Sequence, residues 1–352
     1  MQLHPRHILA VLLLLVGAAG CTPKGPGGGT GKDSGTSTDG GGTTSTDGGG
    51  TDGGGTVTDG GGTTIDIPYV AEEICVGSVM ACARLNTGDV ACWGDDSFLV
   101  DADAVRLRCG GSFCFEDPTG AITCVERGGV RSTDVTVPPD KYQPMTDWWL
   151  NEGNQGGCGV QADSTAVCWP EGEAYFSAVS GRPARHIDFT FSCVVLIDTD
   201  GQVHSLYYDE RCDRHDSEYV LYGMDFPPLG NDWQTVTGGD HHACVLDSEG
   251  RMECWGLSDE DLTPDKDMRF IQMDSGEMAN CGVTTEGTID CRAPMWMFKP
   301  TPIPPGDNWV QVEVAGTNAC ALDTAGQVTC FGDWSSSSSD IQDALHSDPV
   351  VP

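Results

Sequence analysis

The sequence predicts an all-β protein built from seven similar sheet-like units, and three observations support this. In six segments, two cysteines stand ten positions apart on either side of a turn-like run, as in CVLDSEGRMEC. A short segment of strand character precedes each pair, as in WQTVTGG. No long apolar helical periodicity follows the N-terminal segment, which argues against a helical fold.

The six cysteine pairs are expected to form disulfides across antiparallel hairpins. With a short odd loop, residues i and i+10 face each other, and directly opposed Cβ atoms lie about 4.5–5.5 Å apart. Because a disulfide needs Cβ atoms about 3.8 Å apart, the closer, non-hydrogen-bonded pairs suit it best. The alternative, a metal site, lacks the C-x₂-C spacing of zinc modules. The expected bridges are Cys82–Cys92, Cys114–Cys124, Cys158–Cys168, Cys244–Cys254, Cys281–Cys291 and Cys320–Cys330.

A seventh copy of the repeat, CVVLIDTDGQVHSLYY, keeps a cysteine and the turn. It starts at Cys193, and Val203 stands where the second cysteine is expected. Cys75, Cys109, Cys193 and Cys212 then lie outside the pairs, and four cysteines allow three connectivities. Cys75 and Cys109 occupy similar places in neighbouring units, and Cys193 and Cys212 share a unit. We therefore favour 75–109 with 193–212.

The repeats recur with a period near forty residues, and each unit is too small to bury a core alone. Units of this kind are stabilised by packing against their neighbours, and sheet-like ones pack radially. The expected fold is a seven-bladed β-propeller over residues 66–352. Each unit reads as three strands, and the variable polar stretch that follows has room for a fourth.

Two segments, GTNACALDTAGQVTCFGD and GDHHACVLDSEGRMECWG, resemble repeats of the regulator-of-chromosome-condensation type. The resemblance covers about residues 67–352 and implies a seven-bladed propeller, a fold whose members mostly act as interaction platforms. The Gly-Gln-Leu-Gly that follows Trp-Gly in that family is missing here. The resemblance therefore does not extend to nucleotide exchange or chromatin binding.

Large aromatic residues follow the second cysteine in several repeats and are expected to pack between blades. The alternative is an aromatic platform for sugars. His242 matches the histidine of the family pattern and is expected to be structural rather than a metal ligand. His241 would point to the opposite face of the same strand, a poor arrangement for chelation. The aromatic residues are Trp93, Trp169, Trp255 and Phe331.

The N-terminal segment predicts export and lipidation. Residues 1–20 have a basic start and an apolar run from Ile8 to Val16, too short to span a bilayer comfortably, which is typical of a secretory signal; a retained anchor helix is the alternative. The Ala-Ala-Gly-Cys that ends this segment resembles a bacterial lipobox. That resemblance implies cleavage before Cys21, which would carry acyl chains. Residues 21–65, rich in Gly, Thr, Ser and Asp, would form a flexible tether.

Charge and cysteine content narrow the function further. The chain has 53 acidic residues against 18 Lys and Arg, a formal charge of −35. This excess repels phosphate and disfavours nucleic acids and anionic membrane surfaces, whereas basic proteins and cations remain possible partners. Seventeen cysteines in an exported chain indicate a disulfide framework, and lipidation of Cys21 would leave sixteen to pair.

No catalytic motif stands out, because G-x-S-x-G, H-E-x-x-H and phosphate-binding loops are missing from the sequence. The acidic runs Asp259–Asp267 and Asp198–Gly201 lack a dedicated calcium ladder and are expected to be solvated loops and turns. We expect no cofactor, metal site or catalytic residue. The predicted function is a monomeric, lipid-anchored platform in the bacterial cell envelope, at the outer membrane or cell surface, that binds a protein or glycan. A hydrolytic enzyme with its site in the central channel and a structural envelope protein are the alternatives.

Overall fold

The computed structural model describes the ranges 55–58, 64–67, 69–77, 80–109, 112–132, 137–138, 140–150, 156–171, 176–190, 193–207, 227–240, 242–256, 262–277, 279–294, 302–332, 343–345 and 349–350. These ranges lie in one compact unit, Asp52–Pro352. The predicted signal segment and Cys21 lie outside them.

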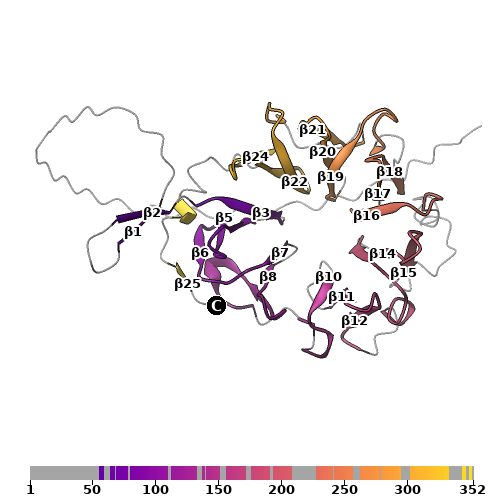
Figure 1. Ribbon diagram of the computed structural model, residues 1–352, viewed down its shortest axis with the longest axis horizontal. Helices are drawn as coiled ribbons and strands as arrows, with labels where there is room; N and C mark the ends of the chain where they lie inside the picture. Colours follow the sequence, from indigo (N-terminus) through magenta and orange to yellow (C-terminus); the bar gives the residue numbers. More distant parts are fainter. Residues whose placement is uncertain are drawn as a thin grey trace, which may run out of the picture. The chain divides into compact units, whose positions relative to one another are not determined.

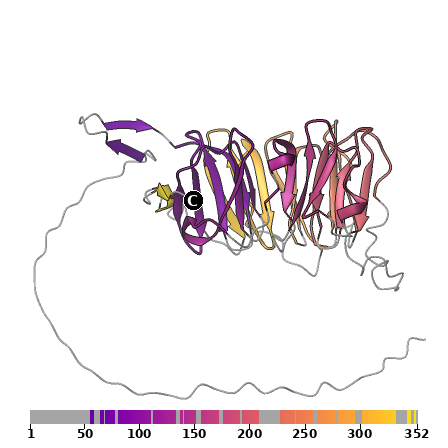
Figure 2. The same cartoon turned by 90° about the horizontal axis from the view of Figure 1, so that it is seen from below.

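Within the described ranges, seven antiparallel sheets follow one another along the chain, and Figure 1 shows them arranged in a ring. The seven-bladed propeller predicted from the repeat is therefore confirmed. In Figure 2 the strands run roughly along the ring axis. We number the sheets blades 1–7, and the first strand of each blade, its inner strand, lies nearest the axis.

The strands of each blade follow in chain order. Blade 1 has β3 (Ala71–Val76), β4 (Met80–Leu85), β5 (Val90–Gly94) and β6 (Phe98–Val100); blade 2 has β7 (Arg106–Cys109), β8 (Phe113–Glu116) and β9 (Ile122–Val125); blade 3 has β10 (Met145–Leu150), β11 (Gly157–Gln161) and β12 (Ala166–Trp169); blade 4 has β13 (His186–Phe189), β14 (Cys193–Ile197) and β15 (Val203–Tyr207). Blade 5 has β16 (Trp233–Gly238), β17 (His242–Asp247) and β18 (Met252–Gly256); blade 6 has β19 (Phe270–Ser275), β20 (Asn280–Thr284) and β21 (Ile289–Arg292); blade 7 has β22 (Trp309–Ala315), β23 (Asn318–Asp323) and β24 (Val328–Gly332).

A few short elements complete the described secondary structure. Three 3₁₀ turns, η1 (Arg127–Gly129), η2 (Asp140–Tyr142) and η3 (Phe176–Ala178), lie in blade-to-blade connections, and β1 (Gly55–Thr58) pairs with β2 (Thr64–Ile67) ahead of blade 1. None of the described helices is long or apolar enough to cross a membrane.

The second and third strands of each blade are joined by a tight turn that the sequence encodes locally. In blade 5, Asp247 Oδ1 accepts the N–H groups of Glu249 (2.9 Å) and Arg251 (2.8 Å). Gly250 follows with a φ of 80°, a conformation that glycine adopts without steric cost. Blade 3 uses Ser164 at this position, with a φ of 66°. The turn sets which residues pair across the hairpin.

The six predicted hairpin disulfides are present. The paired cysteines of each hairpin are directly opposite in the ladder, with Cα atoms 3.9–4.1 Å apart, the spacing of close, non-hydrogen-bonded pairs. The prediction that cysteines ten positions apart face each other across a hairpin is therefore confirmed. A seventh disulfide, Cys75–Cys109, is the pairing favoured from the sequence and joins the inner strands of blades 1 and 2.

The register expected for blade 4 is wrong by two residues. The turn Asp198–Gln202 places Val195 opposite Ser205, and these two residues occupy the bridge positions of the other blades. Cys193 instead pairs with Tyr207, and Val203 pairs with Ile197. The predicted register was obtained by counting ten residues from Cys193, whereas the position of the turn sets the register. Cys193 is buried, and Cys212 lies outside the described residues, so the 193–212 bridge remains a prediction.

The apolar core is divided among the junctions between blades. Seven buried clusters in the described residues each combine side chains of two neighbouring blades. Cys244 and Cys254 of blade 5, for example, pack against Phe270 and Met273 of blade 6. At the blade 4–5 junction Val195 fills the place that cysteine holds elsewhere. No blade buries its apolar face alone, which is why the fold needs all its repeats.

The aromatic residues after the second cysteines pack between blades, as predicted. Trp93 lies in the cluster of blades 1 and 7, Trp169 in that of blades 2 and 3, Trp255 in that of blades 4 and 5, and Phe331 in that of blades 6 and 7. Each is at most 5% exposed, so none forms a surface platform for sugars.

The ring closes between blades 7 and 1, a point that the sequence left open. The C-terminal strand β25 (Pro349–Val350) pairs in parallel with β6 of blade 1, so that both ends of the propeller contribute to one blade. Ala344, in the segment 343–345, is buried in the cluster of blades 1 and 7. In the described residues, blade 1 is thereby extended to five strands, whereas each of the other blades has three. The predicted fourth strand is thus found in blade 1.

Candidate functional site

A cavity of about 780 Å³ lies on the ring axis and is the candidate site. Residues from the inner strands of all seven blades line it, from Glu72–Gly77 of blade 1 to Val310–Gly316 of blade 7. Its wall therefore exists only in the closed ring, because no single blade supplies more than one side of it.

Polar side chains on the inner strands join each blade to the next. Four of these side chains hold the same position in their described strands. In each of the four blades, one inner-strand residue lies directly opposite the first cysteine of the hairpin disulfide, and the side chain in question stands two positions before it. The four are Glu73, Asp147, Gln272 and Gln311. Each accepts a backbone N–H of the next inner strand, namely that of Leu107 (3.2 Å), Ile187 (3.1 Å), Val312 (2.9 Å) and Ile74 (3.0 Å) respectively. We call these four contacts the interblade clasps.

The two glutamine clasps bind the neighbouring backbone on both sides. Gln272 Nε2 also donates to Val312 O (2.9 Å), and Gln311 Nε2 also donates to Ile74 O (2.9 Å). A side-chain amide suits this task because it carries a donor and an acceptor at one end. The contacts satisfy backbone groups that no neighbouring strand pairs with on the channel side.

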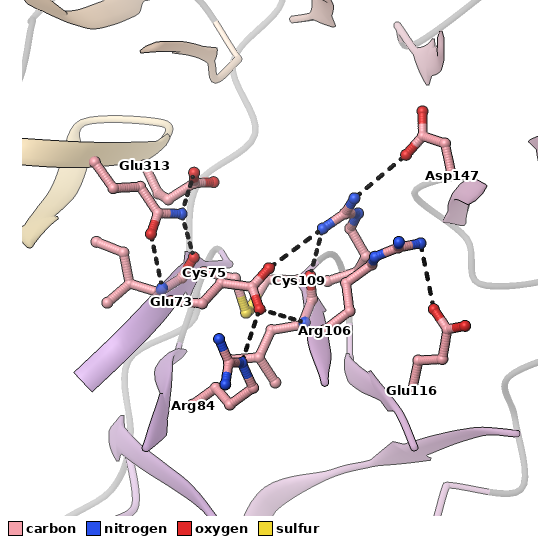
Figure 3. A network of polar contacts seen from close by, with 12 residues as sticks. Glu73, Cys75, Arg84, Arg106, Cys109, Glu116, Asp147 and Glu313 are labelled. Atoms are coloured by element: carbon pink, nitrogen blue, oxygen red, sulfur yellow. Dashed lines mark hydrogen bonds and ion pairs between the residues drawn. A yellow bond between two sulfur atoms is a disulfide. The ribbon is translucent and has the colours of Figure 1, made fainter. Parts of the chain in front are cut away.

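An ion-pair network crosses the wall formed by blades 1–3. Figure 3 shows Glu73 beside Arg84, and Arg106 beside Glu116. Glu73 Oε2 lies 3.2 Å from Arg84 Nε, and Arg108 reaches both Glu73 (3.6 Å) and Asp147 (3.3 Å). The guanidinium of Arg108 also stacks over the ring of Trp149, 4.7 Å from its centroid. One channel-wall cation is thus held by carboxylates and an aromatic ring.

Elsewhere on the wall, the described lining residues include acidic side chains but no further lysine or arginine. Asp188, Asp274 and Glu313 face the cavity from blades 4, 6 and 7, and within the described part of the chain none forms an ion pair. Burial raises the pKa of Asp188 well above its usual value. It also raises the pKa of Asp274 to about 7. Burial, followed by the charge of Asp274, raises the pKa of Glu313 well above its usual value. Carboxyl groups so placed favour either a proton or an external cation.

His186 is the histidine of the described inner strands. Its Nδ1 lies 3.6 Å from Asp147 Oδ2, and burial lowers its pKa. Asp147 Oδ2 already accepts the N–H of Ile187, and Asp147 Oδ1 accepts that of Trp148 at 3.1 Å. The pair therefore sits in a structural network on the wall between blades 3 and 4.

Of the residues singled out by the sequence, Cys75 and Cys109 line the cavity through their disulfide, whereas the others that the structure describes lie away from it. The hairpin cysteines and the aromatic anchors lie in the junction clusters, and His242 is buried and 1% exposed. Asp198 caps its turn by accepting the N–H groups of Asp200 and Gln202, as expected for an ordinary turn. His241 and the first part of Asp259–Asp267 lie outside the described residues. Among those described, no group of three or more His, Cys, Asp or Glu side chains is placed to hold a metal ion.

Sequence reasoning missed the channel residues, although a signal for them was present. The segments FIQMDSG and WVQVEVAG carry a polar residue at every second position of otherwise apolar strands. Gln272 and Asp274, and likewise Gln311 and Glu313, are these residues. Alternation shows that one strand face is polar, but it does not show that this face meets the next blade.

Solved structures with the same fold are known, although sequence comparison finds no relative. No family model matches the chain, and no curated protein matches it. The WD40 ectodomain of the receptor kinase ACR4 from Arabidopsis thaliana is similar with a TM-score of 0.54 and 17% identity, over 75% of this chain and 96% of that one. The ectodomain of the receptor kinase CR4 from Physcomitrella patens gives 0.55 and 15%, over 75% and 73%. Human WBSCR16 gives 0.52 and 11%, over 74% and 89%. These likenesses place the chain in the class of β-propellers.

Proposed function

We propose that this chain is a lipid-anchored envelope protein whose propeller binds a protein partner through a basic segment at the mouth of the acidic channel. The observation that carries the proposal is the charge of the channel wall. In the part of the chain that the structure describes, seven acidic side chains line the cavity against one arginine and one histidine: Glu72, Glu73, Asp188, Asp240, Asp274, Glu277 and Glu313. A lysine or arginine side chain entering this space would gain the electrostatic attraction that the wall gives to Arg108.

Two further features favour a binding role outside the cell. Seven disulfides in the described residues suit an oxidising compartment, where such bridges persist. The propellers of ACR4 and CR4 are likewise ectodomains of receptor kinases. The lipobox-like Ala-Ala-Gly-Cys supports attachment through acyl chains on Cys21. A Cys21→Ala variant should leave the membrane fraction, and mass spectrometry of the N-terminal peptide should lose the acyl mass.

The repeats themselves support a distant kinship. We propose that they are divergent members of the regulator-of-chromosome-condensation type, on the strength of CALDTAGQVTCFG and CVLDSEGRMECWG. The acidic channel favours a partner other than chromatin or nucleic acid, since phosphate would be repelled.

A photo-crosslinking experiment tests the binding site directly. A photoreactive residue replaces Val310 at one end of β22 or Ala315 at the other end, in the full-length chain in cell envelopes. We expect one of the two positions to capture a single protein. Charge reversal at the same end of the inner strands, Glu72→Lys for Val310 or Glu277→Lys for Ala315, should lower the yield at least fivefold.

The matched control changes the same charge away from the channel. Glu126, exposed on blade 2, pairs with Ser132 and does not line the cavity. Glu126→Lys should leave the yield of the crosslinked partner unchanged. Added salt should lower that yield for the chain without a charge reversal, because salt screens the attraction between the channel wall and the partner. Equal loss in all three variants, or capture that ignores every reversal, would overturn the proposal. Capture of a neutral glycan in place of a protein would contradict the protein-binding proposal and would favour a glycan-binding function.

A hydrolytic site in the channel is the second candidate, favoured by the His186–Asp147 contact. It would require His186 to act as a general base on a water molecule or a substrate hydroxyl. A His186→Ala variant that retains partner capture but loses turnover of a hydrolysable ester panel would support this alternative. If no partner and no substrate is found, the structural envelope role remains.

A further inference from the structure

The inner strands of blades 6 and 7 place two carboxyl groups side by side in the ring. Asp274 pairs with Cys281 in blade 6, and Glu313 pairs with Cys320 in blade 7, so the two residues hold the same position in adjacent blades. Asp274 Oδ2 accepts the N–H of Val314 across the junction at 2.7 Å. Strands β19 and β22 therefore touch through one of these carboxyl groups, next to the Gln272 clasp.

Glu313 is held close to the same junction by side-chain amides. Its Oε1 accepts from Gln311 Nε2 at 2.8 Å and from Gln272 Nε2 at 3.4 Å. Gln272 belongs to blade 6, so this contact also crosses the junction. The two carboxyl groups thus take part in one hydrogen-bonded seam between the blades.

Among the described residues, neither carboxyl group of the pair has a cation as an ion-pair partner. The strand β16, packed against β19, contributes Thr237, which bonds to Ser275 and carries no charge. Across the channel, Arg108 is engaged by Glu73 and Asp147 and interacts with the pair at a distance. The remaining charged groups that line the same cavity are acidic: Glu72, Glu73, Asp188, Asp240 and Glu277.

We propose that the junction between blades 6 and 7 is a proton-operated latch, closed while Asp274 and Glu313 are both protonated and loosened as they ionise. Two adjacent carboxylates in a site with little water repel each other, and separation of the blades would let water reach them. Loss of the latch would free β22 from β19 and open the channel wall on that side.

The direction of the pH response follows from the raised pKa of Asp274, about 7 in the folded chain. For a carboxyl group whose folded pKa lies above its unfolded one, the stabilisation is fully present below the unfolded pKa. It is lost as pH rises through the folded pKa. The latch should therefore be more stable at pH 6 than at pH 8.5, with the stabilisation from Asp274 lost as pH rises through about 7.

Hydrogen exchange followed by mass spectrometry on the intact chain tests the latch. After correction for the intrinsic pH dependence of exchange, peptides covering β19 and β22 should lose protection at least tenfold between pH 6 and pH 8.5. Peptides covering β8 and β9 of blade 2, which contact neither strand, should change little. Unchanged protection of β19 and β22 in the wild-type chain would overturn the proposal, whatever the variants do.

Variants then assign the effect. The double variant Asp274→Asn and Glu313→Gln keeps hydrogen-bonding oxygens but cannot ionise, so its protection should be independent of pH in this range. Glu286→Gln, on an exposed turn of blade 6, is the matched control and should behave as the wild type. If the double variant does not fold, each single variant should still reduce the pH-dependent change. Full retention of that change in both singles would refute the assignment.

Discussion

Gln311 is the side chain through which blade 7 forms hydrogen bonds with the backbone of blade 1, and its removal should destabilise the closed ring. The amide accepts the N–H of Ile74 at 3.0 Å and donates to the carbonyl of Ile74 at 2.9 Å. Ile74 is 2% exposed, so water cannot readily replace the lost partners. Two net hydrogen bonds are worth about 1–3 kcal/mol, and an orphaned buried donor adds at least about 1 kcal/mol. We expect Gln311→Ala to lower the free energy of unfolding by about 2–4 kcal/mol.

Urea denaturation of the oxidised chain measures this loss. With a slope of about 3 kcal/mol per molar urea, the midpoint should fall by roughly 1 M without a change in slope. Gln234→Ala is the control, because Gln234 is an exposed inner-strand glutamine of blade 5 that donates to Asp232 O. A loss below about 0.5 kcal/mol for Gln311→Ala, or an equal loss for both variants, would show that the clasp does not stabilise ring closure.

Three more predictions follow from the hairpins. The double variant Cys244→Ala and Cys254→Ala should lower the free energy of unfolding by about 2–3 kcal/mol, because the unfolded hairpin regains the conformational freedom that the disulfide removes. Thermal unfolding of the variant beside the wild type measures this loss, and an unchanged midpoint would contradict the prediction. Val195→Cys with Ser205→Cys should form a new bridge in blade 4, detected as a linked peptide under non-reducing conditions; if these two cysteines remain reduced, the register described for this hairpin is wrong. The turn hydrogen bonds, that of the Thr119 hydroxyl foremost, hold the pKa of Asp117 below its usual 3.8, so its stabilisation is present above pH 4 and lost as pH falls through the lowered pKa. Asp117→Asn should flatten the loss of stability between pH 4 and pH 2 in acid titrations, and an unaltered acid limb would exclude this role.

The sequence predicted those parts of the fold that depend on short-range spacing. Cys320 and Cys330 lie on one hairpin, and ten residues around a tight turn fix their distance whatever the rest of the chain does. The same ten-residue spacing gave the wrong register in blade 4 because it was counted from Cys193. Counting from the turn Asp198–Gln202 would have given Val195 and Ser205.

The channel residues could be noticed in the sequence but not assigned. A polar residue such as Gln272 in an apolar strand is consistent with an exposed face, a buried hydrogen bond or a binding site. Its role depends on where Val312, forty residues later, is placed by the ring. That no described cation pairs with Asp274 likewise depends on which inner strands surround it.

The sequence by itself determined the repeating unit, its sulfur bridges, its turns and the acidic character of the whole chain, because each of these is a property of neighbouring residues or of composition. The tertiary structure alone decided how the ring closes, which side chains clasp adjacent blades and which carboxyl groups face the channel without an ion-pair partner among the described residues. These features join residues as far apart as Ile74 and Gln311, 237 positions along the chain. Such contacts arise only once all the blades have packed around one axis.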